Sequence, residues 1–395
     1  MRSINPIRES CGDKKMLIKD ICTSITDGSH NPPQGIASSS YLMLSSKNVF
    51  DDKITLDEPR FLSEEDFAKE NKRTNVKCGD ILLTIVGTVG RAAVVSSDLP
   101  PFTLQRSVAV LHPKEEVCSS RYLMYALRGK RSYIESHSKG VAQKGIYLKE
   151  VAGIDLPVHP KAMQEKITNR LDKLAFIIKC RQQELQKLDD LVRARFVELF
   201  GDPETNPNSW DITKLSRFCD LKNGYAFRSG DYVESSAVLN CRMSNIRPDG
   251  GFDAEYHPKF LPDEFWDRYK EYRLKDGDVI IAMTDMANDP KILGVPTIVK
   301  TNGKRFLLNQ RVGKLTFYNT ECINNVYLMF VLSQKHIRQQ LVKNAGGSTQ
   351  INVGKPAILG IEFFVPPMEL QEQFAAFVAQ VAKSKFTKTF SLLQC

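Results

Sequence analysis

The chain has 395 residues, of which 42% are hydrophobic and 26% charged, so it can bury a sizeable core and global disorder is not expected. At ~100–200 residues per domain, this length predicts two or three domains. The formal net charge of +9 favours a polyanionic partner, with nucleic acid ahead of an anionic membrane.

The N-terminal 15 residues mix charges and have no apolar centre, and no apolar run reaches the ~18 residues that span a bilayer. We therefore expect neither a signal peptide nor a membrane span. The nine cysteines are odd in number and form no Cys-x-x-Cys pair, which argues against a disulfide framework or a metal site. Reduced thiols in a cytoplasmic protein are the expected state.

A long-period repeat organises the chain. Its clearest pair is 77–84 and 275–282, where a Gly-Asp turn leads into an apolar strand. Further pairs follow the same order and predict a duplicated α+β domain, each copy followed by a helix. These pairs are 61–63 with 260–262, 102–108 with 307–312, 153–158 with 360–366, and Gln164-Glu165 with Gln371-Glu372. Within the second of them, Gln105-Arg106 is matched to Gln310-Arg311.

The first helix has apolar residues at alternating steps of four and three, a heptad pattern typical of a coiled coil. An ordinary amphipathic helix on a globular core is the alternative. Residues 163–199 would form a rod of ~55 Å, ended by Asp202-Pro203. Arg181 and Arg195 interrupt the seam, which consists of Ile167, Leu171, Leu174, Ile178, Leu185, Leu188, Val192 and Leu199.

A shorter helix after Pro367 keeps the same spacing at Leu370, Phe374, Phe377 and Val381 and then loses it. We expect the two helices to pair as an antiparallel coiled coil, with a near-twofold relation between the domains. The predicted organisation is a first globular domain at 1–160, a long helix at 161–202, a second globular domain at 203–366 and a shorter helix at 367–395.

This layout resembles the specificity subunits of type I restriction–modification systems over nearly the whole chain. The motifs that carry the resemblance, each weak alone, are specific in their order and duplication. They are Asp27-Gly28-Ser29-His30, the two Gly-Asp strands, Gln105-Arg106, Gln310-Arg311, the apolar-Pro segments at 157 and 366, the Gln-Glu helix starts and Leu199-Phe200-Gly201-Asp202. The short second helix departs from the family, as does the leader before Met16.

The resemblance implies that each domain reads one half of a bipartite double-stranded DNA target, and that the helices act as a ruler. It also implies two DNA methyltransferase subunits docked on the helices, and restriction/translocase subunits that complete the complex. S-adenosylmethionine, ATP and magnesium would belong to those partners, so this chain would be non-catalytic and would hold no cofactor or metal.

Catalytic motifs are incomplete in this chain. Asn31-Pro32-Pro33-Gln34 lacks the aromatic residue of the adenine-methyltransferase loop, and no Gly-rich donor loop accompanies it. Asp263 and Asp289-Pro290-Lys291 resemble a nuclease pattern only formally, because the intervening proline disfavours a strand. A free-standing methyltransferase or nuclease is one alternative function, and a coiled-coil adaptor that does not bind DNA is another.

Polar loops with small residues are the candidate DNA-binding segments, since Lys and Arg neutralise phosphates while Asn, Gln and Arg can read base edges. For the two Gln-Arg pairs, base reading and structural anchoring of the loops stay equally open. In the first domain the candidates are Ser29, His30, Asn31, Arg91, Gln105, Arg106, Lys139, Gln143 and Lys144. In the second they are Lys222, Asn223, Tyr225, Arg228, Lys291, Gln310, Arg311, Lys343, Ser348, Thr349 and Gln350.

Overall fold

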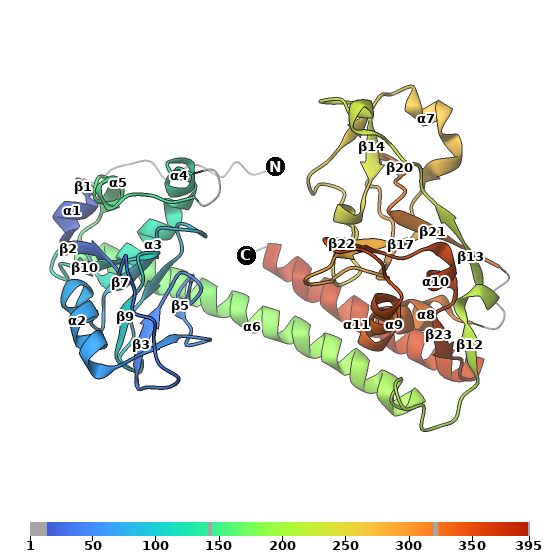
Figure 1. The fold of residues 1–395 in the computed structure, drawn as a ribbon, viewed down its shortest axis with the longest axis horizontal. Helices are drawn as coiled ribbons and strands as arrows, with labels where there is room; N and C mark the ends of the chain where they lie inside the picture. The colour runs from blue at the N-terminus through green and yellow to red at the C-terminus, as the bar shows by residue number, and fades with distance from the viewer. Residues whose placement is uncertain (1–13, 141–143, 319–322, 394–395) are drawn as a thin grey trace. The chain divides into compact units, whose positions relative to one another are not determined.

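The computed structural model describes residues 14–140, 144–318 and 323–393. The chain divides into two compact units, residues 1–179 and 180–395, and the division falls inside α6 (Lys161–Phe200) (Figure 1). Both units combine small sheets with helices, which confirms the predicted α+β class.

The first unit contains two principal sheets. The four-stranded sheet has the order β2-β10-β7-β8, and the three-stranded sheet has the order β6-β3-β9. The strands of the first are β2 (Cys22–Asp27), β10 (Val108–Pro113), β7 (Ile81–Thr84) and β8 (Ala92–Val94). Those of the second are β6 (Arg60–Leu62), β3 (Tyr41–Leu44) and β9 (Phe102–Leu104). Two short pairs accompany them, β1 (Lys14–Leu17) with β11 (Asp155–Val158) and β4 (Val49–Phe50) with β5 (Lys53–Ile54).

Strand β10 is buried on both faces, because successive side chains of a strand point to opposite sides. Val108 and Val110 enter the core shared with the three-stranded sheet, and Ala109 and Leu111 enter the core shared with the helices. This explains why the strand is a continuous apolar run. The helices of this unit before α6 are α1 (Ile18–Ile21), α2 (Glu64–Thr74), α3 (Ser120–Gly129), α4 (Arg131–Ser136) and α5 (Leu148–Ala152).

The second unit repeats this plan with sheets of the order β13-β21-β17-β19 and β15-β14-β20-β16. The strands are β13 (Cys219–Asn223), β21 (Val312–Phe317), β17 (Val279–Ala282), β19 (Pro296–Ile298), β15 (Phe260–Leu261), β14 (Val238–Cys241), β20 (Arg305–Leu308) and β16 (Arg273–Leu274). Two short pairs are β12 (Ile212–Lys214) with β23 (Glu362–Phe364) and β18 (Thr284–Met286) with β22 (Gln350–Asn352). The α-helices are α7 (Phe265–Arg268), α8 (Asn325–Leu332), α9 (Lys335–Lys343), α10 (Lys355–Leu359) and α11 (Met368–Leu393).

The duplicated turns and helix starts predicted from the sequence have matching geometry. Gly79 and Gly277 have φ of +90° and +86°, the left-handed region that glycine tolerates. At the helix starts, Gln164 Oε1 accepts from Ser119 N at 2.9 Å, and Gln371 Oε1 accepts from Asn324 N at 2.8 Å. Both glutamine side chains are fully buried, so each fastens a helix to the domain before it.

The matching of the two Gln-Arg pairs is wrong by one residue. Ser29 forms a parallel bridge with Gln105, whereas Tyr225 forms the equivalent bridge with Asn309. Arg106 N donates to Ser29 O, and Gln310 N donates to Tyr225 O. Arg106 therefore corresponds to Gln310, and Arg311 stands at the position of Ser107. The cause is that both connections have three residues, 105–107 and 309–311, and the letters Gln-Arg stand one position later in the second.

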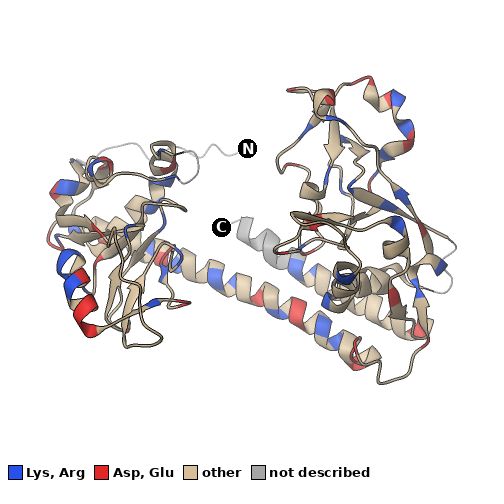
Figure 2. Cartoon of the chain, in the orientation of Figure 1, with Lys and Arg blue, Asp and Glu red and all other residues tan. Residues whose placement is uncertain are grey.

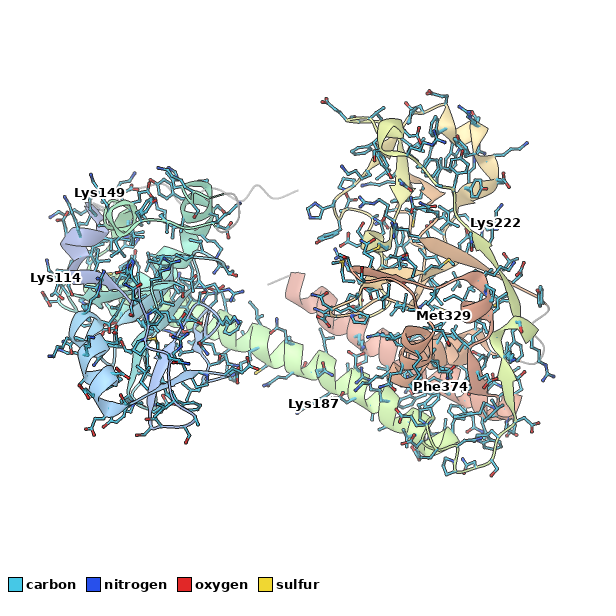
Figure 3. All side chains as sticks on the ribbon, viewed as in Figure 1. Lys114, Lys149, Lys187, Lys222, Met329 and Phe374 are labelled. Carbon is cyan, nitrogen blue, oxygen red and sulfur yellow. The ribbon has the colours of Figure 1, made fainter. Side chains whose placement is uncertain are left out.

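Within the second unit, the end of α6 packs antiparallel on α11, as predicted. Phe200 and Phe196 of α6 contact Phe374, with ring centroids 5.6 and 5.5 Å apart, and Asp189 pairs with Lys385 further along (Figure 3). The seam differs from prediction. Leu174 and Ile178, which the heptad pattern placed on the seam, are each 51% exposed. Between residues 169 and 200 the buried side chains are Phe196 and Phe200, and neither belongs to the predicted seam.

Candidate nucleic-acid interface

In the first unit, three predicted residues surround one cavity of 640 Å³. His30, Arg106 and Lys139 line it together with Arg73 and Asp27. Asp27 ends β2 and is buried, and its carboxylate accepts from His30 Nε2 at 2.8 Å and from the Arg73 guanidinium. The cavity thus carries more cationic than anionic groups, which suits a phosphate.

The backbone explains the position of Arg106. Gly28 allows β2 to approach the segment after β9, because a Cβ there would lie 2.1 Å from Leu104 O. Ser29 N donates to Leu104 O at 2.8 Å, and Arg106 N donates to Ser29 O at 2.9 Å. This parallel contact fixes the backbone while the Arg106 side chain stays exposed. Arg106 can therefore reach a ligand without breaking any contact that holds the loop.

The rest of the cavity wall is apolar. It includes Ile85, Val86, Ile146 and Leu148, and beside them Tyr147, which is 69% exposed. An exposed aromatic ring next to cationic side chains is a combination used to stack on bases while phosphates are neutralised.

The other candidates in the first unit lie outside this lining. Arg91 packs over the Phe50 ring at 4.9 Å, so its guanidinium has a structural contact. Asn31 and Lys144 are exposed, and the Lys144 carbonyl accepts from Gly87 N at 2.9 Å. Gln143 lies outside the described residues. Pro32 and Pro33 have carbonyls that accept from Arg60, as in a supported surface turn.

In the second unit, Arg311 and Gln350 are brought together by β22. Arg311 Nη1 donates to Gln350 Oε1 at 3.0 Å and to Asn352 Oδ1 at 3.3 Å. Asn352 Oδ1 also accepts from Thr284 Oγ1 at 2.7 Å. This network holds the guanidinium in one orientation, as directional recognition of a base edge requires.

A second group in this unit is aromatic. Tyr225 lies against Tyr269 and Tyr272, with ring centroids 4.4 and 5.5 Å apart. Lys222 on β13, labelled in Figure 3, donates to Glu271 O at 2.8 Å and lies over the Tyr272 ring. Gln310 N donates to Tyr225 O, so this group adjoins the Gln310-Arg311 segment.

The remaining candidates of the second unit are dispersed. Lys291 pairs with Asp289 at 2.9 Å, and Arg228 N donates to the Asp231 carboxylate at 2.6 Å. Five others are exposed side chains or loop residues whose role stays a prediction. Asn223, Gln310, Lys343, Ser348 and Thr349 form this set, all exposed.

Sequence reasoning missed Arg73, Tyr147, Tyr269 and Asn352 among these groups. Arg73 lies in α2, 46 residues from Asp27, and nothing local marks it as a partner. Asn352 lies two residues after the predicted Gln350 on the same strand, so Gln350 was the available signal. Figure 2 shows Lys and Arg spread over both units, and basic composition alone would not locate the two groups.

Neither a metal site nor a membrane-spanning helix is found within residues 14–140, 144–318 and 323–393. No group of three or more His, Cys, Asp or Glu side chains there is placed to hold a metal ion. No helix there is long and apolar enough to cross a membrane.

Comparison with known proteins identifies this architecture. Residues 39–189 and 207–390 match the family described as "Type I restriction modification DNA specificity domain". The chain belongs to this family. The two matched segments cover both repeats, so the duplication seen in the sheets is a duplication of that domain.

Individual relatives agree with the family. The chain is 25% identical to the type I restriction enzyme MjaVIII specificity subunit of Methanocaldococcus jannaschii over 327 residues, 77% of this chain and 72% of that protein. It is 29% identical to the EcoBI specificity subunit of Escherichia coli over 129 residues, 32% of this chain and 27% of that protein. The crystal structure of the S subunit from M. genitalium shares the fold, with a TM-score of 0.53 at 13% identity, covering 99% of this chain and 94% of that one.

Proposed function

We propose that this specificity subunit reads an asymmetric bipartite DNA sequence, one half through each unit, and has no catalytic turnover alone. The observation that carries the proposal is that the two units share one backbone arrangement but carry different side chains in the segment that joins β9 to β10 and β20 to β21. Arg106 is exposed beside a basic cavity, whereas Arg311 is held by Gln350 and Asn352. Arg106 corresponds to Gln310 and Arg311 to Ser107, so the two units present different side chains at equivalent positions, and these would select different bases.

The specificity subunit would direct adenine methylation and restriction by partner subunits. Two DNA methyltransferase subunits and the restriction/translocase subunits are the proposed partners, and S-adenosylmethionine, ATP and magnesium would be bound by them. What supports this division is the family membership together with the incomplete catalytic motifs in this chain. Asp289 and Lys291, which a nuclease would need for a metal and a water, pair with each other.

The proposal is tested by Arg106→Gln and Arg311→Gln, assayed with the proposed methyltransferase partners on a library of duplexes. Loss of a bidentate base contact costs about 1–3 kcal/mol of discrimination. Each variant should relax selection in one half-site, and the two variants should affect different halves. Lys300→Gln, an exposed lysine on a loop of the second unit, is the matched control and should select the same sequence as wild type. Relaxation of the same half-site by both arginine variants would contradict independent reading.

A further inference from the structure

The duplicated frame allows a position-by-position comparison away from the proposed DNA-reading loops. Tyr122 Oη donates to Pro157 O at 2.9 Å, and Tyr327 Oη donates to Phe364 O at 2.6 Å, so α3 and α8 correspond. Asn48 Oδ1 accepts from Ser45 N at 3.0 Å, as Asn245 Oδ1 does from Arg242 N at 2.8 Å. The turn that follows Asn48 therefore corresponds to the turn that follows Asn245.

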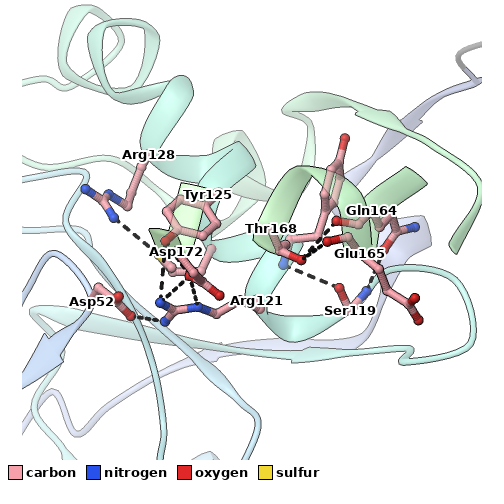
Figure 4. Close-up of polar contacts among 11 residues, drawn as sticks. Asp52, Ser119, Arg121, Tyr125, Arg128, Gln164, Glu165, Thr168 and Asp172 are labelled. Carbon is pink, nitrogen blue, oxygen red and sulfur yellow. Dashed lines mark hydrogen bonds and ion pairs between the residues drawn. The ribbon is translucent and has the colours of Figure 1, made fainter. Parts of the chain in front are cut away.

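In the first unit, carboxylates from this turn and from α6 neutralise the arginines of α3 and α4. Arg121 pairs with Asp52 and with Asp172, and Figure 4 shows it between the two carboxylates. Asp51 lies 2.5 Å from Arg131 and 3.9 Å from Arg128. The cationic face of the helices is thus satisfied within the unit.

The second unit has lost two of these three acids. Counted from Asn245, Pro248 stands where Asp51 stands, and counted from Gln371, Ala379 stands where Asp172 stands. Asp249 keeps the place of Asp52, and its carboxylate accepts from Gly251 N at 3.0 Å. The turn and the helix therefore supply one carboxylate here in place of three.

The arginines are replaced as well, since Val326 and Ser333, counted from Tyr327, stand where Arg121 and Arg128 stand. Other cationic side chains line a cavity of 560 Å³ at this place. Arg193 of α6 and Lys335 and Arg338 of α9 contribute to the wall, and none of the three forms an ion pair with any described residue. The Nε atom of Arg338 is buried and has no hydrogen-bond acceptor in the described part of the chain. A buried unsatisfied donor costs free energy unless a ligand supplies the acceptor.

The remainder of the cavity gives the ligand its second property. Asp189 lines the wall but is paired with Lys385, so it neutralises a different cation. The Lys335 end of α9 also faces the cavity, and the amides of its first turn add donors for an anion. The floor is apolar and consists of Val192, Phe330, Val378, Val381 and Ala382.

We propose that this cavity binds a small phosphate-bearing ligand with an aromatic or apolar body, of the class of a nucleoside monophosphate. The phosphate would take the place that Asp51 and Asp172 fill in the first unit, and the base would lie on the apolar floor. A volume of 560 Å³ is in the ordinary range for small-molecule sites. This site is separate from the residues proposed to read DNA, and its occupancy goes beyond that proposed function.

The test is isothermal titration of the full chain with AMP, adenosine and inorganic phosphate. AMP should bind one to one, and more tightly than either half of it alone. Arg338→Gln should weaken AMP at least about ten-fold, because a charge-assisted hydrogen bond is lost. Pro248→Asp, which restores an acid to the cavity wall, should also weaken it. Lys300→Gln should bind AMP as wild type does, and unchanged tryptophan emission would show that each variant is folded.

A DNA phosphate has the same chemistry, and a separate arm distinguishes it. Binding of a non-target duplex should show the same salt dependence in Arg338→Gln as in wild type. A salt slope flattened by about one charge in that variant would assign the cavity to the DNA backbone and overturn the proposal. No binding of AMP up to about 10 mM, or unchanged AMP affinity in Arg338→Gln, would overturn it as well.

Discussion

The two units attach a helix to the same kind of domain by different chemistry. In the first unit, α6 meets α3 through a polar group, in which Asp172 accepts from the guanidinium of Arg121 and from Tyr125 Oη at 2.6 Å (Figure 4). In the second unit, the contact is aromatic. Phe330 of α8 lies 4.8 Å from Phe196 of α6 and 5.1 Å from Phe374 of α11, between ring centroids.

The difference shows which contacts the duplicated frame requires. Two contacts are present in both units. They are the hydrogen bond to the buried glutamine at each helix start, and the hydrogen bond from a tyrosine hydroxyl to a carbonyl of β11 or β23. The helix residues one or two turns after each buried glutamine differ between the units, and can be charged, as Asp172 is, or aromatic, as Phe374 is. The aromatic contact of the second unit buries more apolar surface, because both α6 and α11 cover α8. The polar contact of the first unit relies on Arg121 and Asp172, which remain partly exposed.

The largest effect should come from the aromatic contact. Phe374→Ala should lower the free energy of unfolding of the second unit by about 3–5 kcal/mol, because Phe374 is fully buried among other rings. Denaturation followed by tryptophan fluorescence measures this, since Trp210 and Trp266 both belong to that unit. Ile167→Ala, at the equivalent place in the first unit, is only partly buried and should cost less, about 1–2 kcal/mol by hydrogen exchange. An equal loss of unfolding free energy in the two variants would contradict the stated difference between the aromatic and the polar attachment.

A smaller effect, alike in both units, is expected for the buried glutamines. Gln164→Ala leaves Ser119 N without its acceptor, and Gln371→Ala does the same to Asn324 N. Each should cost about 2–3 kcal/mol, because a buried backbone donor becomes unsatisfied. Exposed Gln182→Ala on α6 is the control. A cost in only one unit would mean that the two helix starts are not equivalent.

The polar contact should give the smallest effect and the only one sensitive to pH. Burial opposes ionisation of Asp172, but hydrogen bonds from Arg121 and Tyr125 outweigh it and lower its pKa. Its contribution should therefore be present above the unfolded pKa of about 3.9 and be lost as pH falls through the lower folded value. Asp172→Asn should cost about 1–2 kcal/mol at pH 7 and progressively less below pH ~4.

The pH dependence of the Asp172 contribution would be measured by urea denaturation at several pH values, with unfolding of the first unit monitored by hydrogen exchange of its amides. Asp190→Asn provides the control, because this aspartate is exposed on the same helix and its carboxylate accepts only from Gln186 among the described residues. A cost for Asp172→Asn that stays constant from pH 7 to pH 2 would contradict the assignment of the lowered pKa to this contact.

Much of the fold was predictable because the duplicated turns have geometric reasons that the letters reveal. A Gly-Asp turn before an apolar run specifies a left-handed residue and a buried strand, and it did so at Gly79 and at Gly277. The two Gln-Arg pairs were matched wrongly because the same letters stand one position apart in connections of equal length. Heptad spacing reports where apolar side chains recur along α6, but it does not say which of them a second helix covers.

The candidate site was less predictable for a related reason. Residues near a recognised turn, such as His30 and Arg106, were found because the local pattern marks the loop. Arg73 was missed because its contact with Asp27 depends on the packing of α2 against the end of β2, which no local pattern encodes. The cavity lined by Arg193 and Arg338 joins side chains of α6 and α9, which are far apart in the sequence, so no local pattern marks it.

Replacement of residues 206–366 by the equivalent span of another specificity subunit tests the central claim most directly. The readout is the methylated sequence produced by the variant with the proposed methyltransferase partners, determined across a genome. Independent reading by the two units predicts that one half-site changes to that of the donor protein and the other stays as it was. A change in both half-sites together, or in neither half-site of an active complex, would contradict the account.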